Sequence, residues 1–150
     1  MGVSLKKGVQ EFSIGNYKAA FTIFKPLAEQ GYARAQFALG VMYERGDGVP
    51  QDYAEAFNWY RKAAIQGFAA AQDNLGAMYD HSHGVPQNYI NAAASYNKAA
   101  AQGDPIAQYN LGLIYANGYG LPRDYVKAFN WFSQAAAQGD ATAEARLGWM

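Results

Sequence analysis

The sequence contains no cysteine, no excess of charge of either sign and no long apolar run. Without cysteine, disulfides, thiolate catalysis and cysteine-ligated zinc are excluded, although the cellular compartment stays open. Twelve Lys and Arg residues balance twelve Asp and Glu residues, so nothing favours binding to nucleic acid or to an anionic lipid surface. No stretch is long and apolar enough to span a membrane, and the first residues lack the apolar core of a signal peptide. We therefore expect no nucleic-acid partner and no membrane insertion.

Apolar residues make up 51% of the sequence, which is enough for a packed core. One pattern occurs three times: YERGDGVPQDY begins at Tyr43, YDHSHGVPQNY at Tyr79 and YANGYGLPRDY at Tyr115, so each copy starts 36 residues after the last. Self-similarity at a fixed period of this size indicates a solenoid, in which each repeat packs on its neighbours. The sequence therefore predicts one continuous array rather than several domains.

Each repeat contains two segments with apolar residues at helical spacing, which predicts an all-α array of antiparallel helix pairs. We place the units at roughly residues 1–31, 32–67, 68–103 and 104–139, with a partial fifth unit at 140–150. Asp52 followed by Glu55 fits a capping box before the second helix of its pair. The same N-cap position holds Asn16, Asn88 and Asp124, and glycines that can end the second helices stand at 31, 67, 103 and 139.

Glycine recurs inside the first helix of every pair, at positions 8, 40, 76, 112 and 148. A glycine in a helix interior costs about 1 kcal/mol relative to alanine, so we expect close backbone approach between the two helices of a pair. The first unit has a shorter turn between its helices, and the later units insert a Gly-x-Gly-Val-Pro segment there. Val49, Val85 and Leu121 in these segments are predicted to point inward.

The segment AQFALGVMYERGDGVPQDYAEAFNWYRKAAIQG resembles the Sel-one-like repeat of the suppressor/enhancer-of-lin class, a relative of tetratricopeptide repeats. The first unit, with its short IGNY turn, resembles a plain tetratricopeptide repeat. The resemblance implies a right-handed α-solenoid whose first helices line a concave groove. It also implies a non-catalytic scaffold or adaptor that binds a protein or peptide, often in bacterial envelope, signalling or host-contact settings, either exported or cytoplasmic.

Carrying the groove positions of tetratricopeptide proteins onto this chain gives a set of candidate partner-binding residues. They are Arg34, Phe37, Val41, Glu44 and Arg45 in the second unit; Asp73, Asn74, Ala77, Asp80 and His81 in the third; and Ile106, Tyr109, Asn110, Leu113 and Asn117 in the fourth. Phe37 and Tyr109 would be aromatic anchors. Asn74 and Asn110 could hydrogen-bond to an extended peptide backbone. The alternative is that these residues form an ordinary solvated face.

Two Ser-x-x-Lys patterns, Ser4 with Lys7 and Ser95 with Lys98, match the spacing by which lysine activates serine in penicillin-recognising enzymes. The Ser-Asp-Asn and Lys-Thr-Gly motifs of those enzymes are missing, so a β-lactam-binding or hydrolase activity, associated with some relatives, is the alternative rather than the main prediction. The Gly-x-Gly pairs follow no predicted strand and lack the third glycine of a dinucleotide site. We predict no cofactor.

The histidines of YDHSHGVPQNY, His81 and His83, raise the question of a metal site. A zinc site usually needs three or four protein ligands, and beyond Asp80 none is forced nearby. The equivalent positions in the other copies are not metal ligands, so we predict no metal and interpret His81 as a rim residue of the groove.

Two further features set the ends and the middle of the array apart. The sequence stops at ARLGWM, the opening of another repeat, from which we expect a fragment of a longer protein and a homodimer through the uncapped C-terminal end. In the third unit, Ala93 and Ser95 replace the aromatic pair Phe57 and Trp59. This replacement predicts either looser packing or a small pocket at that place.

Overall fold

The computed structural model describes residues 2–150, with side chains from Ser4 onward. Within this range the chain forms nine helices and no strand. They are α1 (Gly2–Ser13), α2 (Tyr17–Glu29), α3 (Ala33–Arg45), α4 (Tyr53–Ile65), α5 (Ala69–His81), α6 (Tyr89–Ala101), α7 (Pro105–Asn117), α8 (Tyr125–Ala137) and α9 (Ala141–Trp149). Each helix packs on the next along the chain, most closely within the pairs α1–α2, α3–α4, α5–α6 and α7–α8. The predicted α-solenoid of helix pairs is confirmed.

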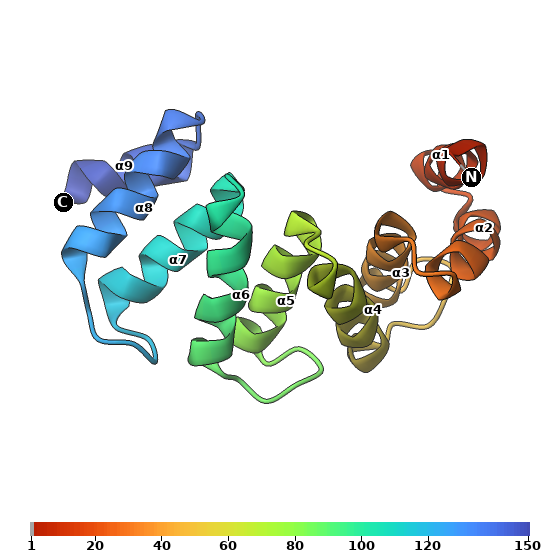
Figure 1. The fold of residues 1–150 in the computed structure, drawn as a ribbon, viewed down its shortest axis with the longest axis horizontal. Coiled ribbons are helices and arrows are strands. Elements are labelled where there is room, and N and C mark those ends of the chain that lie inside the picture. Colours follow the sequence, from red (N-terminus) through yellow and green to blue (C-terminus); the bar gives the residue numbers. More distant parts are fainter. Residues whose placement is uncertain (1) are drawn as a thin grey trace.

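The helix pairs form a curved array, and its first and last helices stand on the same side of the middle ones (Figure 1). We call α1, α3, α5, α7 and α9 the A helices, and α2, α4, α6 and α8 the B helices. The buried residues form separate clusters along the array instead of one central core. This arrangement follows from the repeat, because one helix pair cannot bury its apolar face without a neighbour. In the described chain no helix is long and apolar enough to cross a membrane.

Three of the four predicted N-caps of the B helices are confirmed. The side chain of Asp52 accepts a hydrogen bond from the backbone N–H of Glu55, and Asn88 and Asp124 cap α6 and α8 in the same way. The prediction for Asn16 was wrong, because its side chain forms no cap and instead donates to Glu11 Oε2 at 2.8 Å. The short turn before α2 gives Asn16 a ψ of 70°, outside the extended conformation of the other caps.

Except for Gly148 in α9, the glycines inside the A helices each lie under an aromatic ring of the paired B helix. A Cβ added to Gly40 would lie 2.5 Å from the ring of Tyr60, and one added to Gly76 would lie 2.7 Å from the ring of Tyr96. The space beside these glycines is therefore used, but the predicted backbone approach was wrong, because the group that approaches each glycine is an aromatic ring and not the backbone of the B helix. No atom lies within 4 Å of the Cβ position of Gly148, since no B helix covers α9 in the described chain.

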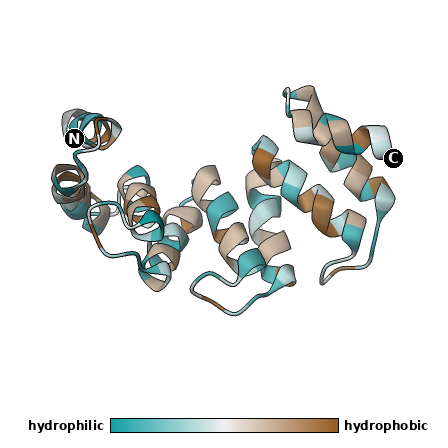
Figure 2. Ribbon diagram, turned by 180° about the vertical axis from the view of Figure 1, so that it is seen from behind, coloured by the Kyte–Doolittle hydropathy of each residue, from teal (hydrophilic) through white to brown (hydrophobic). Residues whose placement is uncertain are grey.

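The long loops between A and B helices connect neighbouring repeats. Gly48 has a φ of +76°, and a Cβ there would lie 2.9 Å from the backbone of Tyr17, the first residue of α2. Val49 and Leu121 pack against core clusters, as predicted, and Val85 is half-buried. The loops are mostly hydrophilic with a short hydrophobic segment (Figure 2). Each loop therefore rests on the preceding B helix.

A buried glutamine network joins successive repeats, and the sequence analysis did not predict it. Gln36 Nε2 donates to the carbonyl of Ala28 at 3.2 Å, and Gln36 Oε1 accepts from Gln66 Nε2 at 2.8 Å. Gln66 Nε2 also donates to the carbonyl of Gly31 at 2.9 Å. The pairs Gln72–Gln102 and Gln108–Gln138 repeat the side-chain contact. These bonds satisfy carbonyls at the end of a B helix and fix the position of the next A helix.

Candidate functional site: an apolar cleft on the A-helix face

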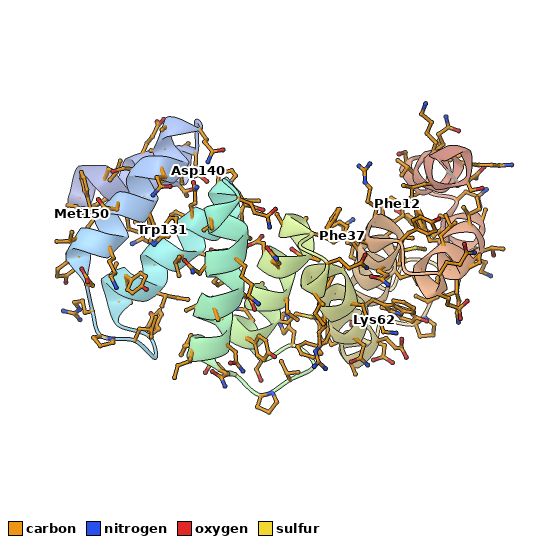
Figure 3. All side chains as sticks on the ribbon, viewed as in Figure 1. Phe12, Phe37, Lys62, Trp131, Asp140 and Met150 are labelled. Atoms are coloured by element: carbon orange, nitrogen blue, oxygen red, sulfur yellow. The ribbon has the colours of Figure 1, made fainter. Side chains whose placement is uncertain are left out.

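A cleft of about 410 Å³ lies along the A helices at the N-terminal end of the array. We call it the A-helix cleft. It is lined by Leu5, Val9, Phe12, Phe24, Arg34, Phe37, Ala38, Val41, Arg45, Phe68 and Asn74. Because α1, α3 and α5 all contribute, the A helices converge on this space. Phe12 and Phe37 lie on the inner side of the arc, and Lys62 of α4 lies on its other side (Figure 3).

The walls of the A-helix cleft are aromatic, and its edges are cationic. The ring of Phe37 packs on Phe68 at a centroid distance of 5.2 Å and on Tyr60 at 5.8 Å. Arg34 and Arg45 are exposed at the ends of α3. An apolar surface that stays open to solvent with cations beside it suits an apolar side chain next to an acidic one.

The cleft brings together five of the predicted partner-binding residues: Arg34, Phe37, Val41, Arg45 and Asn74. Two others, Glu44 and Asp80, instead accept hydrogen bonds from buried tyrosines. Tyr60 donates to Glu44 Oε1 at 2.5 Å, and Tyr96 donates to Asp80 Oδ2 at 3.2 Å. Burial raises the pKa of Tyr60, and the bond to Glu44 raises it further, so the hydroxyl stays protonated and remains the donor.

Asp73 occupies the position of Phe37 in the third unit, but its side chain is only 7% exposed. Its Oδ1 is buried without a hydrogen-bond partner in the described chain. Burial raises the pKa of Asp73 to about 7, the nearby carboxylate of Asp104 raises it too, and Asn110 lowers it. A buried acidic group beside a second acid destabilises the junction between α5 and α7 when it is ionised.

The predicted residues of the fourth unit lie apart from the cleft. Tyr109 packs on Phe132 with ring centroids 5.6 Å apart, and its hydroxyl accepts from Arg146 Nε at 3.4 Å. Asn117 Nδ2 donates to the carbonyl of Leu113 at 2.9 Å. Ile106 is exposed, and Ala77 in the third unit is half-buried. A groove that runs the full length of the A helices stays a prediction.

Of the two histidines between α5 and α6, His83 has a structural role. The ring of His83 stacks on Tyr53 with centroids 4.5 Å apart and an interplanar angle of 8°. His81 is exposed, its ring lies 5.9 Å from that of His83, and it does not line the A-helix cleft. Over the residues that the structure describes, no three His, Cys, Asp or Glu side chains form a group that could hold a metal ion.

Four cleft residues that the sequence analysis missed belong to the first unit: Leu5, Val9, Phe12 and Phe24. The groove positions of tetratricopeptide repeats gave candidate residues only in the second, third and fourth units, and none in the first. Val9 is an apolar residue that stays exposed in the structure. Its position on an amphipathic helix was the signal in the sequence that could have identified it as a cleft residue. Phe68 was missed because it precedes α5 and belongs to no helix position.

The hydrolase alternative and the homodimer both stay predictions. Ser95 and Lys98 both line a pocket on the B-helix face, and loss of nitrocefin turnover in Ser95→Ala would support the hydrolase alternative. Trp149 is 89% exposed at the C-terminal end, where a homodimer would form. Light scattering over a dilution series tests that association.

An array of stacked helix pairs with an open face defines the class of α-solenoid repeat proteins. The chain belongs to the Sel1 repeat family: the Sel1 repeat model matches residues 33–68, 69–104 and 105–140. The resemblance found in the sequence is thus confirmed, and the matched repeats begin with α3, leaving α1 and α2 outside them.

Several solved structures of bacterial proteins are similar to the structure of this chain. A Sel1 repeat protein from Oxalobacter formigenes is 36% identical, with a TM-score of 0.91 over 97% of this chain and 59% of that one. The protein c5321, a protective antigen of uropathogenic Escherichia coli, is 41% identical, with a TM-score of 0.94 over 98% of this chain and 32% of that one. Helicobacter pylori cysteine rich protein B, 22% identical with a TM-score of 0.65, shares the fold.

Among curated proteins, DAP3-binding cell death enhancer 1 of Rattus norvegicus and of Mus musculus is similar over a short stretch. Each is 40% identical over 45 residues, which are 30% of this chain and 9% of the relative. The chain therefore spans less than a tenth of these relatives and 59% or less of the two most identical structures above.

Proposed function

We propose that this chain is a non-catalytic interaction module that binds a protein or peptide segment in the A-helix cleft. The observation that carries the proposal is the open cleft itself, in which Phe12, Phe37 and Val41 line a space of about 410 Å³. Large aromatic anchors in a concave site are the residues that dominate binding energy in protein interfaces. Membership of the Sel1 repeat family supports the same role, since this fold commonly serves as a protein-interaction scaffold.

The chemistry of the cleft specifies the kind of partner segment. The apolar walls require at least one large apolar side chain, and Arg34 and Arg45 at the edges favour an acidic residue beside it. Asn74, which offers both a donor and an acceptor, can pair with the backbone of the bound segment. The partner we propose is therefore a segment in which apolar residues alternate with or adjoin acidic ones.

The test uses Val9→Glu, because Val9 lines the cleft yet is 53% exposed and contributes little to the core. Peptides are selected on the purified chain from a random display library, and their affinities are measured by fluorescence anisotropy. We expect the best peptides to contain apolar and acidic residues, and Val9→Glu to weaken them at least tenfold, because a buried carboxylate would face the apolar anchor.

The matched control is Val126→Glu, which introduces the same charge at a residue that is 71% exposed on α8, outside the cleft. This variant should bind within twofold of the unmodified chain, and both variants should keep its melting temperature. Equal loss of affinity in the two variants, or no loss in Val9→Glu, would place the binding site elsewhere.

A further inference from the structure

The third unit carries a pocket of about 290 Å³ on the B-helix face, separate from the A-helix cleft. We call it the B-helix pocket. Its walls are residues of α4 and α6, and α5, which lies between them in Figure 1, forms its floor. The lining residues are Arg61, Ala64, Ile65, Gln72, Leu75, Tyr79, Asn91, Ala94, Ser95 and Lys98.

The B-helix pocket differs from the hollows of the neighbouring units in its lining and not in its presence. Trp59 lines a groove of about 460 Å³ in the second unit and Trp131 one of about 350 Å³ in the fourth, whereas the third unit has a serine at this position. The position of Ser95 is occupied by Trp59 in the second unit and by Trp131 in the fourth. In the second unit the ammonium group of Lys62 lies over the ring of Trp59, 4.6 Å from its centroid. Lys98, the equivalent lysine, has a serine in place of that ring. The two predicted consequences of Ser95, looser packing or a pocket, stay predictions, since Trp59 and Trp131 line hollows of comparable volume.

The polar groups of the B-helix pocket favour an anion. Arg61 on one wall and Lys98 on the other are both exposed cations, and Asn91 and Ser95 add hydrogen-bond donors beside Lys98. Arg61 also lines the adjoining groove with Glu55 and Lys62, so one acid accompanies two cations there. A carboxylate between a guanidinium and an ammonium group would be held by charge-assisted hydrogen bonds.

The floor of the pocket offers apolar contact instead of competing acceptors. Gln72 is buried, with Nε2 donating to the carbonyl of Ala64 and Oε1 accepting from Gln102, so its amide is engaged in the network between repeats. Leu75 and the exposed Ile65 provide apolar surface beside the cations. An acidic side chain with an aliphatic neighbour matches this combination.

We propose that the B-helix pocket is a second binding site, which takes a glutamate or aspartate side chain from an acidic segment of a partner protein. The site does not depend on the A-helix cleft, because no residue lines both. The chain would then contact partners on both faces of the array.

The test titrates the ¹⁵N-labelled chain with the capped peptide Gly-Ala-Glu-Glu-Ala-Gly, which lacks the large apolar side chain that the A-helix cleft requires, and follows amide shifts by NMR. Saturable shifts should cluster at Arg61, Ser95 and Lys98, and the peptide with Gln in place of Glu should bind at least tenfold more weakly. Ser95→Trp restores the side chain of the neighbouring units, which removes the hydroxyl donor and places an indole ring between the polar groups of the pocket. It should fold, as judged by circular dichroism, and lose at least tenfold in affinity.

Charge reversal at two equivalent lysines separates the pocket from general electrostatic attraction. Lys98→Glu and Lys62→Glu change the net charge equally, but only Lys98 lines the pocket. Lys98→Glu should weaken the peptide at least tenfold, and Lys62→Glu and Val9→Glu less than twofold. Equal effects of the two lysine variants, unchanged binding by Ser95→Trp, or identical shifts and affinity with acetate or inorganic phosphate alone would each overturn the proposal.

Discussion

The second unit (α3 and α4) and the third unit (α5 and α6) share one framework but differ in one side chain on each face of the array. In both, a glycine of the A helix lies under a tyrosine of the B helix, and a buried glutamine joins the unit to its neighbours. In the second unit, Phe37 lies on the A-helix face and Trp59 on the B-helix face. The third unit has the buried Asp73 and the pocket-lining Ser95 at those positions.

The comparison shows which positions the packing fixes and which it leaves free. The tyrosine–carboxylate pair illustrates a fixed combination: Tyr60 bonds to Glu44 and Tyr96 to Asp80. In the fourth unit both partners differ: Phe132 replaces the tyrosine, and Ala116 replaces the carboxylate residue. A lone carboxylate or hydroxyl would be buried without a partner, so the two positions change together. Positions 73 and 95 have no such partner, and they carry the third unit's differences.

The largest expected effect tests the shared framework. Gly76→Val places a branched side chain where a Cβ already lies 2.7 Å from the ring of Tyr96, and we expect a loss of about 3 kcal/mol in the free energy of unfolding. Gly40→Val should lose a similar amount through Tyr60. Urea denaturation measures both. Gly148→Val, with no atom within 4 Å of the Cβ position, is the control and should change stability little.

The second effect concerns the buried acid of the third unit. The pKa of Asp73 is raised in the folded state to about 7, so the folded chain binds this proton more tightly than the unfolded chain. The contribution of this group to stability is therefore greatest at acidic pH and is lost as the pH rises toward 7 and above. Asp73→Asn removes the charge and should stabilise the chain by about 2 kcal/mol at pH 8.

Denaturation curves at pH 5 and pH 8 check this prediction. The gain from Asp73→Asn should shrink at pH 5, where the wild-type carboxyl is already protonated in the folded state. Asp124→Asn makes the same change of charge at an N-cap where asparagine also serves, as Asn88 does, and is the control for the loss of one negative charge. A gain for Asp73→Asn that is equal at both pH values would contradict a titrating carboxyl.

The smallest effect exchanges a loop residue between the two units. Ser82 has a φ of +59°, the left-handed conformation that Gly46 adopts in the second unit with a φ of +76°. Glycine reaches this conformation without a steric cost, so Ser82→Gly should stabilise the chain by about 1 kcal/mol. Gly46→Ser should destabilise it by a similar amount. Thermal melting of the two variants measures the exchange, and a loss of stability in Ser82→Gly would mean that the bond from Ser82 Oγ to the carbonyl of Val85 outweighs the strain.

Much of the fold could be predicted because its signals are local and occur several times. Helical spacing, the caps at Asp52 and Asp124 and the C-terminal glycines each depend on a few adjacent residues. The glutamine network could not be predicted, because Gln36 and Gln66 look like ordinary polar residues until two repeats are stacked. The A-helix cleft was predicted in part, from Phe37 and its neighbours, and its first-unit wall was missed.

The sequence by itself determined the helix pairs, their period of 36 residues and the family, because repetition makes a weak local signal unambiguous. Only the tertiary structure decided which side chains share a space. Asp73 and Phe37 have the same register, yet one carboxyl is buried beside Asp104 and one ring lines the cleft. Ser95 lines a pocket together with Arg61 of the preceding repeat, whereas Lys62 of the same unit lies over the ring of Trp59. Such outcomes depend on the volume and charge of neighbours from other repeats, which no single segment of sequence specifies.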